Sequence, residues 1–256
     1  MNFHSENNLF IRFEQPLDEY EVPVDFSQMI DGIPHPLCAL AAEDLQQHIL
    51  KQKEWQHNFG LDSEAEGMVI GKMFGVLVVQ NQQKEIGYLA AFSGKLAGKN
   101  HHDKFVPPVF DTLAEDGFLN IGMQKLSLLN DEIRLLEFAN ADKGKIQSLK
   151  AARKKYSNAL QSEIFEHYHF LNQAGEEKSL TELFTAFNYK NPPAGAGECA
   201  GPKLLQYAFV HKLKPLALAE FWWGLSPKSN QWKHKEFYAC CKEKCEPILA
   251  HMLKAI

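Results

Sequence analysis

Apolar residues recur at characteristic spacings along the chain, and these spacings predict the helices and strands of the N-terminal half. Between Ala39 and Glu54 they stand at helical spacing, which predicts an amphipathic helix. Two apolar runs follow, Met73–Val79 and Ile86–Phe92, with a short polar segment between them. We expect these runs to pair as an antiparallel β-hairpin. Four prolines interrupt residues 1–36, which we therefore expect to be irregular.

The middle of the chain carries the pattern of two long helices. Apolar residues at three- and four-residue steps predict helices over Phe118–Phe138 and Lys143–Asn172. Because the segment between them is short and polar, we expect the helices to fold back on each other as an antiparallel hairpin. The hairpin, residues 118–172, is then an insertion into an α/β core domain formed by residues 1–117 and 173–256.

The C-terminal third alternates between helical and strand patterns. Leu180–Phe187 and Gly201–Lys212 are predicted helices, and Pro202 suits the first turn of the second one. The apolar run Leu216–Gly224 predicts a strand, and a final helix is expected to hold Pro247–Leu253. This mixture places the fold in the α+β or α/β class, with helices flanking a sheet.

The amino-acid composition indicates which class of protein the chain belongs to. The chain has 256 residues, of which 45% are hydrophobic and 11% aromatic, with a net charge of −5, so we expect a folded protein rather than a disordered one. No apolar run reaches the ~18 residues of a membrane-spanning helix, and residues 1–6 lack the basic start of a signal peptide. We therefore expect a soluble, cytoplasmic protein that does not contact a membrane.

The basic residues are almost all lysines, and they are unevenly distributed. Only three of the 27 are arginines, which disfavours sequence-specific DNA recognition, because base reading commonly uses the arginine fork. From Lys203 onward there are nine lysines and four glutamates, so this part of the chain can attract RNA without reading its bases. A solvated lysine-rich surface is the alternative. The same two interpretations apply to a basic cluster on the second long helix, formed by Lys150, Arg153, Lys154 and Lys155.

Five cysteines are present, and the spacing of three of them suggests metal binding. An odd number of cysteines does not suit a disulfide framework. Cys199 directly precedes one predicted helix, and Cys241 and Cys245 lie one helical turn apart near the next. Helix N-termini favour thiolates, so we expect these three cysteines to bind zinc, with His234, water or a substrate as the fourth ligand. The alternative is that they are buried free thiols that pack as small apolar residues.

Further candidate ligand-binding residues lie in loops and near the ends of strands. Asn100 and His101 follow the second predicted strand in a glycine-containing loop, which is a common place for a binding site. Trp222 and Trp223 can stack on a base, although aromatic residues on strands more often belong to the core. The lysine candidates for contact with an anionic group are Lys203 and Lys228.

Two short motifs flank the last predicted strand. Residues 199–202 are Cys-Ala-Gly-Pro, and the pair Cys241–Cys245 opens the following helix. This arrangement resembles the zinc-dependent nucleoside and nucleic-acid deaminases, whose first motif includes a Cys-Ala-Glu-Pro form. The resemblance implies a deaminase-like sheet flanked by helices, and a zinc ion that activates water while a glutamate moves protons. The chain departs from the family at Gly201, where the glutamate is expected, and in the longer cysteine spacing, so Glu198 is the candidate proton carrier.

Several longer strings are distributed over most of the chain: Gly71–Gln80, Ala91–Gly98, Asn100–His102, Lys104–Asp111, Gly197–Ala200, Pro202–Phe209, Ala219–Gly224 and Ser226–Lys228. Together they resemble the N-terminal extension of long bacterial RluA-type pseudouridine synthases, in which a coiled coil of variable length lies where residues 118–172 lie here. The resemblance implies RNA and a C-terminal synthase domain as partners. That family's catalytic His-Arg-Leu-Asp signature is absent from residues 1–256, whose single Arg-Leu pair is Arg134–Leu135. We expect either such an extension or a free-standing relative.

Three functions remain open from the sequence. The first is an accessory, RNA-associated module of a pseudouridine-synthase-type protein, able to bind zinc but without an isomerase site of its own. The second is a zinc-dependent deaminase acting on a nucleobase or nucleotide, with Cys199, Cys241 and Cys245 on the metal and Glu198 moving protons. The third is a scaffold that binds a partner protein through the helical hairpin.

Overall fold

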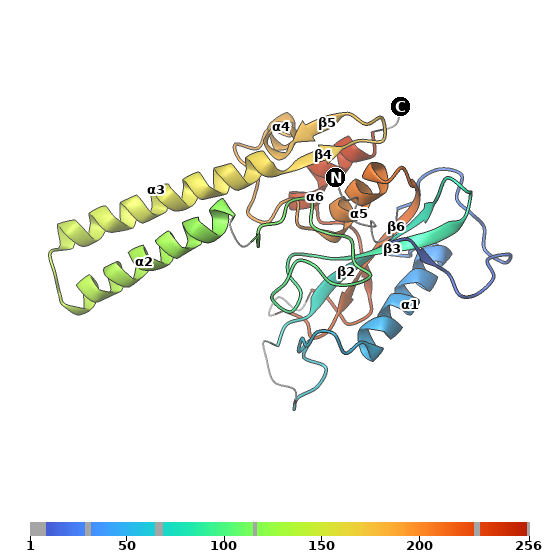
Figure 1. Ribbon diagram of the computed structural model, residues 1–256, viewed down its shortest axis with the longest axis horizontal. Helices are drawn as coiled ribbons and strands as arrows, with labels where there is room; N and C mark the ends of the chain where they lie inside the picture. Colours follow the sequence, from blue (N-terminus) through green and yellow to red (C-terminus); the bar gives the residue numbers. More distant parts are fainter. Residues whose placement is uncertain (1–8, 29–31, 65–68, 115–116, 228–230, 255–256) are drawn as a thin grey trace, which may run out of the picture.

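An antiparallel sheet of five strands lies at the centre of the molecule (Figure 1). The structure is a computed structural model that describes residues 9–28, 32–64, 69–114, 117–227 and 231–254. In their order across the sheet, the strands are β1 (Ile11–Arg12), β3 (Ile86–Phe92), β2 (Lys72–Gln80), β6 (Lys214–Trp223) and β7 (Phe237–Tyr238). The expected pairing of the first two apolar runs is confirmed, because β2 and β3 are antiparallel neighbours.

Helices cover both faces of this sheet because its central strands are apolar on both sides. Successive residues of a strand point to opposite faces, and in β2 the side chain of Val76 packs on one face and that of Leu77 on the other. On the first face lies α1 (Pro36–Lys51). On the second face α5 (Ala200–Val210) packs on the strands, α6 (Lys242–Met252) packs against α5, and α4 (Leu180–Ala186) packs against α6 in the same hydrophobic core.

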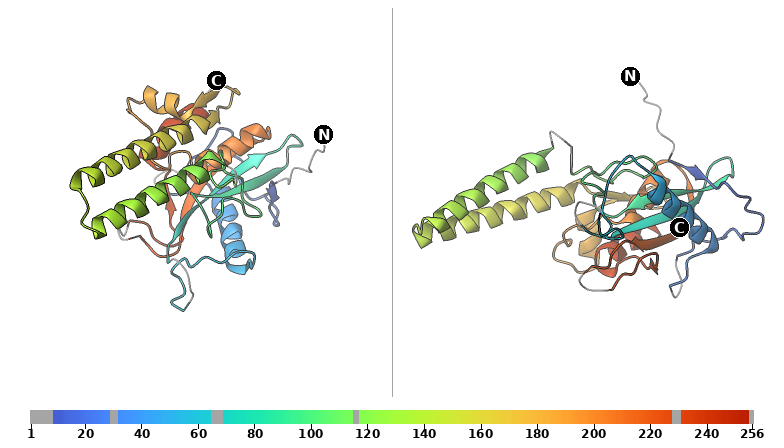
Figure 2. Two further views of the ribbon diagram at one scale, coloured as in Figure 1. Left: turned by 60° about the vertical axis from the view of Figure 1, so that its left-hand side comes forward. Right: turned by 90° about the horizontal axis from the view of Figure 1, so that it is seen from below.

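A long pair of helices extends away from the sheet and its covering helices (Figures 1 and 2). These helices, α2 (Phe118–Phe138) and α3 (Lys143–His167), lie side by side, and Gly122 of α2 packs directly against α3. At the base of the pair, the rings of Phe118 and His167 stack with their centroids 5.0 Å apart. The first residue of α2 and the last residue of α3 are therefore in contact.

The second long helix is shorter than its pattern predicts. Instead of continuing over all of Lys143–Asn172, α3 ends at His167 and the strand β4 (His169–Leu171) follows. Tyr168 and Phe170 are buried in the core while the residue between them is exposed, which is the period of a strand rather than of a helix. The helix prediction is therefore wrong at its C-terminal end. In a small second sheet, β4 pairs with β5 (Glu177–Ser179).

The mixed class of the fold is confirmed: the described residues form six helices, one five-stranded sheet and one two-stranded sheet. The first helix begins at Pro36 rather than Ala39, because proline suits the first turn and the His35 side chain accepts a hydrogen bond from the Leu37 N–H. The last helix begins at Lys242, directly after Cys241 as predicted, and it contains Pro247. No helix in the described part of the chain is both long enough and apolar enough to span a membrane.

Candidate metal centre and pocket

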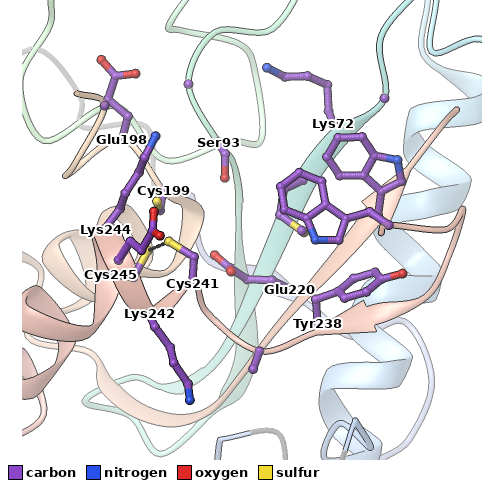
Figure 3. A pocket seen from close by; sticks show the side chains of 18 of the residues that line it. Lys72, Ser93, Glu198, Cys199, Glu220, Tyr238, Cys241, Lys242, Lys244 and Cys245 are labelled. Carbon is purple, nitrogen blue, oxygen red and sulfur yellow. Dashed lines mark hydrogen bonds between the residues drawn. The ribbon is translucent and has the colours of Figure 1, made fainter. Parts of the chain in front are cut away.

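Three cysteine side chains meet where α5 and α6 begin (Figure 3). Cys199 and Cys241 are the N-caps of α5 and α6, and Cys245 lies in the first turns of α6. The Sγ atoms of all three lie within 4.8 Å of one another, and those of Cys241 and Cys245 are 3.3 Å apart. The two helices bring them together because α5 packs on the sheet and α6 packs against α5. The predicted clustering of these three cysteines is therefore confirmed.

The spacing of the sulfur atoms suits a soft metal ion. In a tetrahedral zinc site, Zn–S bonds of ~2.3 Å place sulfur atoms about 3.8 Å apart, which is compatible with three sulfur atoms that all lie within 4.8 Å of one another. The three cysteines can therefore hold a metal ion with little movement of their side chains. Three thiolates leave one position of a tetrahedral ion for water or a substrate.

The three thiols of the cluster differ in pKa. Hydrogen bonds from the thiols of Cys199 and Cys245, together with backbone N–H groups of α6, lower the pKa of the Cys241 thiol. The hydrogen bond with Cys241 raises the pKa of Cys199, hydrogen bonds with Cys199 and Cys241 raise that of Cys245, and burial adds to both effects. Cys241 is thus the first of the three to ionise, and the thiolate is the form that binds metal.

A buried carboxylate lies beside the cysteine cluster. Glu220 of β6 is only 4% exposed, and Figure 3 shows its carboxylate directed toward Cys241. Its Oε1 atom accepts a 2.8 Å hydrogen bond from the backbone N–H of Gly201 in α5. Burial raises the pKa of Glu220 to about 7, so this carboxyl group changes its charge near neutral pH.

The cluster opens into a pocket of about 660 Å³. Part of its lining is aromatic, because Trp222 of β6 lies against Trp232 with the ring centroids 4.7 Å apart. Lys72, Lys242 and Lys244 add cationic groups to the lining. A ligand that combines a flat ring with an anionic group matches these surroundings.

Lys203 is a buried contact between α5 and β3 and is not one of the residues that line the pocket. Its side chain is 3% exposed, and its Nζ atom donates hydrogen bonds to the carbonyl oxygens of Phe92 (3.0 Å) and Gly94 (3.2 Å). Burial lowers the pKa of Lys203 to about 8. This residue therefore fastens the start of α5 to the end of β3, rather than contacting a ligand.

Only one of the two adjacent tryptophans faces the pocket. Successive residues of a strand point to opposite faces, so Trp222 lines the pocket while Trp223 is buried on the α1 side of the sheet. His234 accompanies Trp223, with ring centroids 4.4 Å apart, and its Nδ1 accepts a hydrogen bond from the Gly224 N–H. The structure does not bring His234 to the three cysteines, so the fourth metal position is left to water or a substrate.

The remaining candidates lie in different places. Asn100 and His101 both bond to the carboxylate of Asp111, at 2.9 and 3.0 Å, and neither of them lines the pocket. Glu198 does line the pocket, but Figure 3 shows its carboxylate pointing away from the sulfur atoms. Lys228 lies outside the described residues.

Five charged residues that line the pocket are missing from the sequence-based candidates: Lys72, Glu220, Lys242, Glu243 and Lys244. A signal for Glu220 exists in the sequence, because a charged residue inside an otherwise apolar strand is uncommon and is often functional. Lys72 offers no such signal. It stands at the first position of β2, where a lysine is ordinary.

Comparison of the chain with protein-family models, with curated proteins and with solved structures gives no match. The functional conclusion therefore depends on the cysteine cluster, the buried carboxylate and the pocket that contains both.

Proposed function

We propose that the protein is a zinc-dependent hydrolase of the deaminase type that acts on a nucleobase or nucleotide. The observation that carries the proposal is the meeting of Cys199, Cys241 and Cys245 at the wall of the pocket. Structural zinc sites are commonly closed by four protein ligands, whereas catalytic sites keep one position open. Three cysteine ligands that line a pocket therefore support a catalytic role rather than a structural one.

The order of the elements also supports this class. α5 begins after Cys199, β6 follows, and α6 begins after Cys241. The zinc-dependent deaminases that the sequence resembles carry their two metal-binding motifs in the same order. In this proposal, residues 118–172 are a helical hairpin inserted into a deaminase-like core.

The proposed reaction replaces an exocyclic amino group by oxygen. Bound zinc would supply the lowered pKa of its water, which makes that water a nucleophile near neutral pH. In the net reaction the water oxygen bonds to the ring carbon, the carbon–nitrogen bond breaks, and the amine leaves as ammonia. The pocket residues hold the substrate: Trp222 and Trp232 stack on the base, and Lys72 neutralises a phosphate group.

Metal analysis and ammonia release together test this proposal. Protein purified without chelators should contain about one equivalent of zinc per chain, as expected for one three-cysteine site. It should also release ammonia from cytidine, adenosine, their monophosphates or short RNA. Protein that holds neither zinc nor another soft metal would overturn the proposal, and so would metal-loaded protein that releases no ammonia from any of these compounds.

A second proposed role concerns RNA, and the charge of α3 supports it. The first half of this helix, at the far end of the helix pair, exposes six cationic side chains, which attract phosphate groups without reading bases (Figure 1). This is the property expected of an accessory module related to the extension of pseudouridine synthases. Salt-dependent filter binding of RNA tests it, and no binding at low salt would favour the protein-interaction scaffold instead. The six residues are Lys143, Lys145, Lys150, Arg153, Lys154 and Lys155.

A further inference from the structure

We propose that Glu220 is the catalytic carboxylate of the pocket, the group that exchanges protons with the attacking water and the departing amine. The inference rests on the proposed hydrolase function and deepens it, because the sequence alone points to Glu198 for this role.

The first observation is that Glu220 is buried and yet lines the pocket. Its side chain is 4% exposed, within a strand that is apolar apart from Lys214 at its start, and it belongs to the same pocket lining as the three cysteines. In the described part of the chain its hydrogen-bond partners are neutral: the Gly201 N–H and the thiol of Cys240. A carboxylate with only neutral partners is costly to bury, which is a typical feature of functional sites.

The second observation is that α5 approaches this carboxylate closely. A Cβ atom placed on Gly201 would lie 3.6 Å from Oε1 of Glu220 and 3.3 Å from Sγ of Cys240. The contact with Oε1 would be an ordinary van der Waals contact and that with Sγ a tight one, so this turn of α5 lies directly against Glu220 and its partner Cys240. Gly75, directly opposite Glu220 on β2, likewise lets α5 approach the sheet, because a Cβ there would lie 2.8 Å from that of Ala200.

The two glutamates of the pocket differ in direction. Figure 3 shows the Glu220 carboxylate directed toward Cys241, whereas that of Glu198 points away from the sulfur atoms. Glu220 is also held from both sides, since β6 is paired with β2 and β7. Glu198 lies in the loop before α5, so its side chain is not fixed by a sheet. Position and rigidity both favour Glu220 as the group that acts next to the open metal position.

The proton transfers balance over one turnover. The Glu220 carboxylate takes a proton from the water as its oxygen bonds to the ring carbon, and it delivers that proton to the ring nitrogen. The second proton of the water passes by the same route to the amino group, which leaves as ammonia when the carbon–nitrogen bond breaks. The carboxylate ends in its starting form, and no oxidant or reductant is needed.

The test uses azide binding to the cobalt-substituted protein, which does not depend on knowing the substrate. Azide is an anion that occupies an open metal position, and a carboxylate beside that position repels it. Under mildly alkaline conditions, Glu220→Gln should bind azide about three- to tenfold more tightly than the wild type, as read from the visible spectrum of Co²⁺. The amide oxygen of the new side chain can still accept the Gly201 hydrogen bond, so metal content and melting temperature should stay near those of the wild type.

Two further variants test whether the change in azide affinity comes from the charge of Glu220 in particular. Glu198→Gln removes one charge from the same pocket and should leave azide affinity within about twofold of the wild type, because its carboxylate points away. Glu220→Asp keeps the charge and should bind azide like the wild type. With any substrate that releases ammonia, both Glu220 variants should lose turnover, by about 10²- to 10⁴-fold for Glu220→Gln.

The outcomes distinguish this inference from the proposed function. The assignment of Glu220 would be overturned, with the hydrolase proposal left standing, if azide affinity is unchanged in Glu220→Gln or changes more in Glu198→Gln. It would also be overturned if Glu220→Asp binds azide as tightly as Glu220→Gln does. The expected azide effects without ammonia release would overturn the deaminase reaction while supporting the place of Glu220 beside the metal. A protein that takes up no cobalt would overturn both.

Discussion

Cys240 and Cys241 are neighbours in the chain, but their side chains have different surroundings. Cys241 caps α6, and its sulfur lies with those of Cys199 and Cys245. The thiol of Cys240 instead bonds to the carboxylate of Glu220, and burial raises its pKa. The difference of one residue therefore decides which thiol is available to a metal ion.

This difference gives a direct prediction for single serine variants. Cys199→Ser, Cys241→Ser and Cys245→Ser should each lose most of the bound zinc, because a hydroxyl is a far weaker ligand than a thiolate. Cys240→Ser should keep about one equivalent, since this residue lies outside the cluster. Metal analysis of the four purified variants checks the prediction. Equal zinc loss in the Cys240 variant would show that the cluster has been assigned to the wrong thiols.

Lys203 provides a prediction for pH dependence. Its pKa is about 8 in the folded protein and 10.5 in an ordinary setting, so between these values the unfolded chain holds a proton that the folded chain has released. The free energy of unfolding should therefore rise with pH over this interval, by on the order of 2–3 kcal/mol from this residue. Below pH 8 both states are protonated, and the cost of burying the ammonium is fully present.

Urea unfolding at several pH values compares the wild type with Lys203→Met, which keeps a similar side-chain length without the charge. The rise between pH 8 and 10.5 should be present in the wild type and absent from the variant. Identical pH profiles of the two proteins would contradict a strongly lowered pKa for this lysine.

At the scale of elements, the close approach of α5 to β2 fixes the position of the cysteine that caps α5. Gly75→Ala should destabilise the protein by about 1–3 kcal/mol, because the added methyl would lie 2.8 Å from the Ala200 side chain. It should also weaken zinc binding, since Cys199 precedes Ala200 and moves with it. Thermal melts and zinc titrations measure the two effects.

A compensating variant keeps this prediction specific. Ala200→Gly removes the methyl group that the new side chain would meet, so the double variant Gly75→Ala/Ala200→Gly should recover part of the lost stability and most of the zinc affinity. If Gly75→Ala alone melts and binds zinc like the wild type, the contact between β2 and α5 is looser than the distances indicate.

The sequence predicts the regular elements well where their apolar pattern is long. Both the strand over Ile86–Phe92 and the helix over Phe118–Phe138 have the predicted bounds. The two-residue edge strands β1 and β7 carry no pattern of their own, since pairing with longer neighbours defines them. The cysteine cluster is predictable because helix starts are visible in the sequence. The place of Glu220 is not, because it depends on the register between β2 and β6 and on the packing of α5.

At the scale of the whole molecule, the cationic half of α3 lies at the far end of the helix pair, away from the sheet (Figure 2). Neutralising Lys145, Lys154 and Lys155 together with glutamine should therefore weaken RNA binding and leave zinc content unchanged. If all three contact phosphate, the slope of log affinity against log salt should fall by roughly 2 for single-stranded RNA. Filter binding over a salt series measures this slope.

Three exposed lysines elsewhere provide the control for this experiment. The variant with glutamine at Lys51, Lys53 and Lys178 changes net charge by the same amount but leaves α3 untouched. It should keep nearly the full salt slope. An equal loss in both triple variants would mean that the attraction is a property of the overall charge rather than of the helix pair.

The stacking of Phe118 on His167 has a consequence for the way the chain folds. The end of β3 and the start of α5 must find each other across a long stretch of sequence, since the bond from the Ala200 N–H to Ser93 Oγ spans 107 positions. The pair of α2 and α3 forms from local contacts. Once Phe118 and His167 are in contact, the loop that must still close between Ser93 and Ala200 is roughly half as long. Halving a loop lowers the entropic cost of closing it by about 0.6 kcal/mol. Lengthening or shortening α2 and α3 by the same number of residues would keep the two ends of the pair in contact. The pair can therefore vary in length while the sheet assembles at nearly the same rate.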